Sequence, residues 1–71
     1  MTFKYKVDIL DLLRNAGYST YRIRKEGILG EGTLTKIRAG QMISLENLGI
    51  ICDLLGCFPW DLIESISDIN Q

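Results

Sequence analysis

The stretch GEGTLTKIRAGQ, residues 30–41, decides how this chain is expected to fold. Its two large apolar residues, Leu34 and Ile37, stand three positions apart, which is the spacing of one face of a helix. Gly30 can begin a turn, and Gly40 stands where a left-handed residue commonly ends a helix. The pattern predicts a helix of about nine residues.

The outer face of this helix is expected to be slim. With about 100° of rotation per residue and the two apolar residues directed inward, the opposite side carries Gly32, Lys36, Ala39 and, at its edge, Thr35. Three of these four side chains are small, as a helix that lies in the major groove of DNA requires. Alternatively, the glycines only permit close helix crossing and Lys36 is an ordinary solvated lysine.

Helical patterns extend on both sides of residues 30–41. KVDILDLLRNAGY (6–18) has a broad apolar face that ends near Gly17, and YRIRKE (21–26) follows Ser19 as a candidate N-cap. LENLGIICDLLG (45–56) follows Ser44 in the same way and carries the strongest apolar stripe. Pro59 is expected to open a short fifth helix, PWDLIESI (59–66). At the other end, TFKYKV (2–7) alternates with period two and indicates a short strand.

Basic and acidic residues are separated along the chain. Residues 1–40 hold all eight Lys and Arg and four of the nine Asp and Glu, a net charge of +4, whereas residues 41–71 hold five acids and no base, a net charge of −5. This polarity predicts that the basic half faces a polyanion and the acidic half faces away. The alternative is a chance distribution over a solvated surface.

Composition predicts a single small domain over residues 1–71, with 46% apolar residues. No run of 18 apolar residues and no cleavable leader is evident, so we expect a cytoplasmic protein without membrane contact. Two cysteines without any histidine build no metal site, and we expect both thiols to be buried and reduced. No phosphate-binding loop or catalytic carboxylate pair is present, so we expect no enzyme activity, no cofactor and no small-molecule ligand.

The ordered set of these segments supports a resemblance. Residues 19–64 resemble the Cro/cI-type helix-turn-helix family, also called the XRE family: TLTKIRAG (33–40) is similar to its recognition helix, and SLENLGIICDLLGCFPWDLIE (44–64) to its fourth and fifth helices. The resemblance implies an all-α, five-helix lambda-repressor-like DNA-binding domain. It also implies a dimer that binds duplex DNA as a bacterial or phage transcriptional regulator.

The resemblance also implies a set of DNA-contacting positions. The base-reading positions of the family fall on Glu31, Gly32, Thr33 and Lys36, and its phosphate-contacting positions on Ser19, Thr20 and Tyr21. Together with the exposed side chains expected around them, the DNA-binding residues are Ser19, Thr20, Tyr21, Arg22, Arg24, Glu31, Gly32, Thr33, Thr35 and Lys36.

Two features depart from the family pattern. Arg24 replaces a small residue in the middle of the second helix, so its side chain either faces phosphate or bends around the turn. The segment after the recognition helix, AGQMI (39–43), lacks the usual phosphate anchors, so affinity for DNA is expected to be modest.

A homodimer interface is expected in the acidic half. Trp60, Ile63, Ile66 and Ile69 recur with a spacing of three, as on one face of a continuing helix. Phe58 is expected in the core, and Trp60 either covers the core or joins the dimer patch. If these residues do not form the interface, the segment TFKYKV paired across a two-fold axis is the next candidate.

The sequence therefore predicts a sequence-specific duplex DNA-binding regulator, acting as a homodimeric repressor. The alternative is a helix-turn-helix fold used as a protein-binding module, such as an antitoxin, an anti-repressor or an inhibitor. The missing phosphate anchors and the overall acidity favour this alternative.

Overall fold

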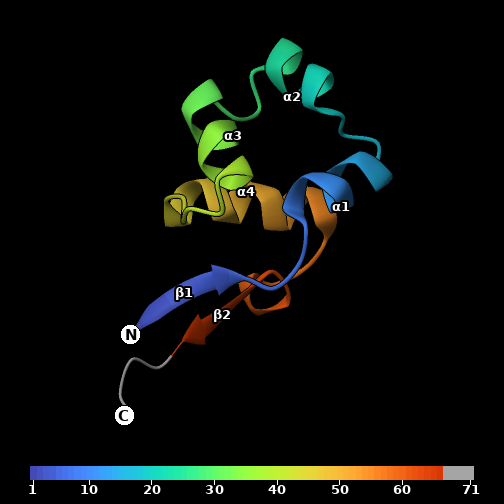
Figure 1. The fold of residues 1–71 in the computed structure, drawn as a ribbon. Coiled ribbons are helices and arrows are strands. Elements are labelled where there is room, and N and C mark those ends of the chain that lie inside the picture. Colours follow the sequence, from blue (N-terminus) through green and yellow to red (C-terminus); the bar gives the residue numbers. More distant parts are fainter. Residues whose placement is uncertain (67–71) are drawn as a thin grey trace.

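A strand stands at each end of a set of four helices. The computed structural model describes residues 1–66. The elements are β1 (Thr2–Tyr5), α1 (Ile9–Asn15), α2 (Thr20–Glu26), α3 (Glu31–Arg38), α4 (Leu45–Leu55), the 3-10 turn η1 (Pro59–Asp61) and β2 (Ile63–Ile66) (Figure 1). Helices α1 and α4 lie between the two-stranded sheet and the pair formed by α2 and α3.

Side-chain caps begin three of the helices, and a left-handed glycine lies at or shortly after the end of each of the four described helices. The side chains of Asp8, Ser19 and Ser44 each accept a hydrogen bond from the backbone N–H three residues later, at 3.1 to 3.2 Å. Gly27 and Gly56 end α2 and α4 with φ angles of 66° and 67°. The caps predicted at residues 19 and 44 are confirmed, and α1 begins later than its apolar pattern indicated because residue 8 caps it.

The prediction of a fifth helix over residues 59–66 is wrong. Pro59 begins only a single 3-10 turn, in which the Asp61 carboxylate accepts a hydrogen bond from the Phe58 N–H at 2.9 Å. The chain then becomes β2, which pairs antiparallel with β1. The described fold is therefore four helices with a two-stranded sheet rather than five helices in an all-α domain, and the short N-terminal strand is confirmed.

Strand pairing changes the arrangement expected for the C-terminal isoleucines. Side chains three positions apart share a face on a helix but point to opposite faces on a strand. Ile63 is accordingly buried, with 7% of its surface exposed, whereas Ile66 is 38% exposed. These two residues do not share one face, Trp60 is 68% exposed, and Ile69 lies outside the described residues.

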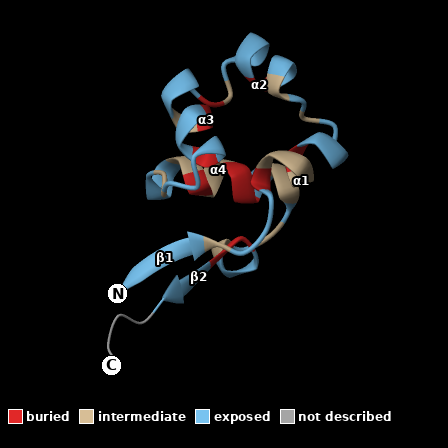
Figure 2. Ribbon diagram, viewed as in Figure 1, coloured by how far each residue is buried: buried red, intermediate tan, exposed pale blue. Residues whose placement is uncertain are grey.

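The core lies between the four helices and the start of β2 (Figure 2). Its buried residues are Ile9, Leu13, Ile23, Leu29, Leu34, Ile37, Leu48, Ile51, Cys52, Leu62 and Ile63. Burial raises the pKa of the Cys52 thiol, and the half-buried Cys57 beside it adds to the rise. Cys52 is buried as expected, whereas Cys57 is only half-buried, and the two form no disulfide. Phe58 was expected in the core, but 74% of its surface is exposed, where it stands as the N-cap residue of η1.

Candidate nucleic-acid interface

Helices α2 and α3 form two successive short helices joined by a tight turn. Residues 27–30 connect them, and Gly27 takes the left-handed conformation that the turn requires. Ile23 of α2 and Leu34 of α3 are almost completely buried, so each helix keeps one side on the core and presents the other to solvent. Both helices lie at the end of the molecule opposite the sheet (Figure 1).

The outer side of α3 is as slim as the sequence predicts. Gly32, Thr35 and Lys36 are all exposed, and a side chain built at Gly32 would meet no atom within 4 Å. The Thr35 hydroxyl donates a hydrogen bond to the Glu31 carbonyl at 3.0 Å, which holds it close to its own helix. A nucleic-acid backbone or base edge can therefore approach α3 closely on this side.

Arg24 bends around the turn and pairs with Glu31. Its guanidinium donates two hydrogen bonds to the Glu31 carboxylate, one of them from Nη2 to Oε1 at 3.0 Å. Both side chains are exposed, so the pair lies on the surface between α2 and α3. Because this geometry is bidentate, it fixes the orientation of both groups more firmly than a single contact would. One unit of positive charge at this edge is thereby neutralised.

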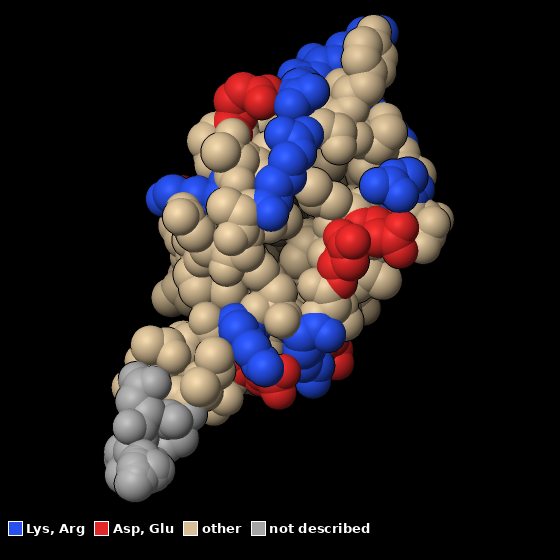
Figure 3. All heavy atoms as spheres, viewed as in Figure 1, with Lys and Arg blue, Asp and Glu red and all other residues tan. Residues whose placement is uncertain are grey.

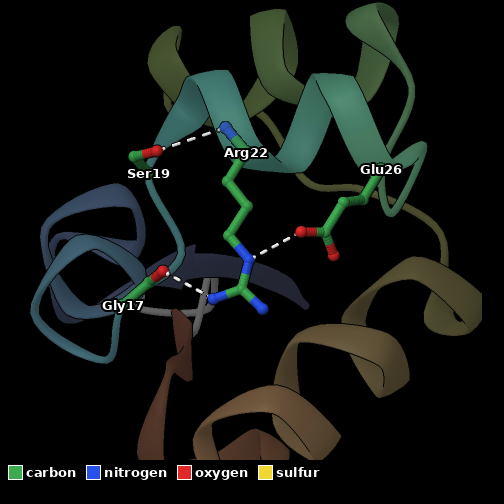
Figure 4. A network of polar contacts seen from close by, with 4 residues as sticks. All are labelled: Gly17, Ser19, Arg22 and Glu26. Carbon is green, nitrogen blue, oxygen red and sulfur yellow. Dashed lines mark hydrogen bonds and ion pairs between the residues drawn. The ribbon is translucent and has the colours of Figure 1, made fainter.

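Arg22 connects α2 to the end of α1 (Figure 4). Its Nε donates to the Glu26 carboxylate at 2.7 Å, its Nη1 donates to the Gly17 carbonyl at 3.0 Å, and its guanidinium carbon lies 4.7 Å from the centre of the Tyr18 ring. The hydrogen bond to Glu26, together with the charge of that carboxylate, raises the pKa of the Arg22 guanidinium. The side chain therefore supports the position of α2 in addition to contributing charge.

Comparison with protein families decides which class this arrangement belongs to. Residues 8–68 match the family model of the Cro/C1-type HTH DNA-binding domain. The chain belongs to this family. Neither the curated proteins nor the solved structures gave a match. The resemblance read from residues 19–64 is thus confirmed, and the matched segment includes all four helices of this Cro/C1-type domain.

The start of α2 is where the family resemblance implied phosphate contacts. Ser19 caps the helix, since its hydroxyl accepts a hydrogen bond from the Arg22 N–H at 3.2 Å. Thr20 is half-buried, and Tyr21 is 71% exposed with the Lys25 ammonium 5.9 Å from the centre of its ring. Of these three residues, the exposed Tyr21 has the greatest reach toward a ligand.

The Thr33 side chain points toward the first turn of α4. The Asn47 side-chain amide donates to the Thr33 hydroxyl at 2.9 Å and joins α3 to the first turn of α4. Thr33 is half-buried, so this contact fixes the angle of α3. The structure brings Glu31, Gly32, Thr35 and Lys36 together on the outer side of the Cro/C1-type domain and turns Thr33 away from it.

Sequence reasoning missed Arg38 as a candidate contact. Arg38 is exposed in the last turn of α3, and within residues 1–66 neither Arg38 nor Lys36 forms an ion pair. Lys and Arg side chains run along the visible surface over α2 and α3 (Figure 3). Its positive charge in the last turn was visible in the sequence, but two residues correspond to about 200° of helical rotation, so Arg38 and Lys36 lie on different flanks of α3.

No helix within residues 1–66 is long and apolar enough to cross a membrane. Over the same range, no group of three or more cysteine, aspartate or glutamate side chains is arranged to hold a metal ion.

Proposed function

We propose that this Cro/C1-type protein, as a single domain, binds specific duplex DNA and represses transcription by occupying its site. The observation that carries the proposal is the outer side of α3, where open space over Gly32 lies beside the exposed Lys36. Arg38 adds a second exposed cation on another flank of the last turn of α3. In this arrangement α3 enters the major groove, where Lys36 donates to guanine or phosphate and Arg38 to the phosphate backbone.

The protein acts as a homodimer in this proposal. One domain supplies one recognition helix, and two such helices in successive major grooves stand about 34 Å apart. A dimer therefore reads two half-sites and gains the specificity that a single slim helix lacks. In this proposal, repression follows from occupancy of the promoter.

Salt-dependent binding of labelled duplexes tests this function. The duplexes come from DNA flanking the gene of this protein, and fluorescence anisotropy measures affinity across a series of salt concentrations. If Lys36 and Arg38 of two copies each contact a phosphate, the logarithm of affinity should fall with the logarithm of salt with a slope of about −3.6 or steeper. Absence of binding to any flanking duplex would contradict the proposal.

The same measurement addresses the second candidate, a protein-binding module. Pairing of Arg22 with Glu26 and of Arg24 with Glu31 reduces the positive charge that α2 can offer to phosphate, which favours this alternative. An antitoxin, anti-repressor or inhibitor that binds through apolar contacts keeps its affinity as salt rises, whereas DNA binding weakens steeply through counterion release.

A further inference from the structure

An apolar groove lies on the side of the molecule formed by the start of α4, η1 and the sheet. It encloses about 350 Å³. Its lining consists of Phe3, Met42, Ile43, Leu45, Leu48, Pro59, Trp60 and Ile63, every one of them apolar. We call this feature the apolar groove. It shares no lining residue with the outer side of α3, so the proposed DNA contact does not cover it.

Three large side chains at the groove remain open to solvent. Leu45 is 84% exposed, Trp60 is 68% exposed and Phe3 is 42% exposed. Together they offer on the order of 400 Å² of apolar surface, which reaches the size at which patches on small proteins mark interaction sites. Leu45 was expected to continue the buried stripe of α4, and its exposure shows that this stripe ends in the groove.

Charge is absent from the groove and from the sheet face beside it. In the strand register, Phe3 lies opposite Ser65 and Tyr5 lies opposite Ile63. The ion pair between Lys4 and Glu64, at 3.7 Å, belongs to the other face of the sheet because strand side chains alternate. A two-fold axis through the groove would therefore bring no like charges together at its centre.

We propose that the occupant of the apolar groove is the same groove of a second copy of this chain, in an isologous dimer. The groove combines a hollow with large exposed side chains at its edge, so two copies can each insert Trp60 and Leu45 beside the other. Residues 67–71 read SDINQ and offer one apolar residue, which suits an apolar groove poorly. This inference rests on the proposed function, because the proposed binding to two half-sites is what requires a second copy of the chain.

The exposed area sets the expected strength of the dimer. About 400 Å² per copy is half of the roughly 800 Å² that each partner buries in a stable complex of standard size. The dimer is therefore weak and reversible in the absence of DNA, and two adjacent half-sites hold the copies together. Trp60 is the expected centre of the interface, because tryptophan in an apolar contact commonly dominates binding energy.

Sedimentation equilibrium without DNA tests the interface. The full chain is measured from micromolar to near-millimolar concentration, alongside the variants Trp60→Gln and Leu45→Gln. We expect reversible dimerisation of the unchanged protein, weakened at least about tenfold in each variant. Phe58→Gln is the matched control, because Phe58 is 74% exposed and does not line the groove. Circular dichroism verifies the fold of each variant.

Trp60 provides a second readout, because it is the only tryptophan of the chain. Its fluorescence emission should shift to shorter wavelength as concentration rises and the ring leaves water, in the unchanged protein and in Phe58→Gln alike. Leu45→Gln should delay this shift to higher concentration. If Trp60→Gln fails to fold, the fluorescence of Trp60 in the unchanged protein, Leu45→Gln and Phe58→Gln still tests the interface.

A chain that stays monomeric over the whole concentration range would overturn the inference, as would an equal loss of dimer in Phe58→Gln. Because no DNA is present, failure of the dimer is separate from failure of the proposed function. A protein that dimerises without binding duplex DNA would retain the groove interface and refute the DNA-binding proposal.

Discussion

At the scale of single residues, Glu31 and Arg24 set the charge at the front of α3. Seven positions separate them in sequence, and only the turn between α2 and α3 brings them together. The sequence left the Arg24 side chain with two possible directions, because local patterns do not determine how a long side chain crosses a turn. The bidentate pair resolves this choice and leaves Glu31 as an acidic group beside the proposed DNA surface.

The first prediction concerns Glu31→Gln. This change removes a negative charge from the proposed interface and releases Arg24 for a phosphate, so DNA affinity should rise and the salt slope should steepen by about one for each bound copy. Fluorescence anisotropy across a salt series measures both effects. Glu46→Gln, on exposed α4 surface, is the control with the same change in charge. A loss of affinity limited to certain duplexes would instead indicate that Glu31 accepts a hydrogen bond from cytosine.

The second prediction concerns Arg22, whose contacts join α2 to the end of α1. Arg22→Gln should lower the melting temperature more than Arg14→Gln does, since Arg14 pairs with Asp11 only within its own helix. Thermal unfolding followed by circular dichroism measures both. Equal effects would show that the contacts to Gly17 and Tyr18 add nothing to an ordinary surface ion pair.

At the scale of secondary structure, helix ends and buried faces could be predicted from the sequence, and the last element could not. Ser19 and Ser44 cap helices through contacts three residues away, which are visible in sequence. The structure of residues 63–66 depends instead on β1, about sixty residues earlier. Because Ile63 and Ile66 suit a helix face by spacing alone, the sequence pattern favoured a helix until a strand partner was known.

The third prediction compares two leucines of α4. Leu48 is 4% exposed in the core, whereas Leu45, three residues earlier, is 84% exposed. Leu48→Ala should lower the free energy of unfolding by about 2 to 5 kcal/mol through lost burial and the cavity that remains. Leu45→Ala should change it by no more than about 0.5 kcal/mol, because the side chain is already in water. Urea denaturation at a concentration where the protein is monomeric measures both, and similar losses would contradict the orientation of α4.

At the scale of the whole molecule, the separation of charge along the sequence becomes a separation in space only in part. Lys and Arg side chains over α2 lie at one end (Figure 3). Arg38, in the last turn of α3, instead lines a cavity with Tyr5 and Val7, next to β1. Lys4 and Lys6, which belong to the same half of the sequence, lie on and beside β1 at the opposite end. Strand pairing causes this difference, since it places the N-terminal segment against the acidic C-terminal half.

This arrangement allows a test that separates local contact from general electrostatic attraction, and it is the fourth prediction. The double variants Lys36→Gln with Arg38→Gln and Lys4→Gln with Lys6→Gln have the same net charge. If α3 contacts phosphate directly, the first variant should weaken duplex binding and reduce the salt slope by about two for each bound copy. The second should leave the slope unchanged, because its lysines lie on and beside β1, at the end of the molecule opposite α2 and the start of α3.

Equal effects of the two double variants would mean that duplex binding depends only on the total charge of the protein. The assignment of α3 as the recognition helix would then be wrong. The comparison requires that both proteins stay folded. Lys36 and Arg38 form no ion pair within residues 1–66, and Lys4 forms one exposed pair with Glu64. Such surface pairs contribute at most about 1 kcal/mol to stability, so any difference in binding reports the position of the charge rather than the loss of the fold.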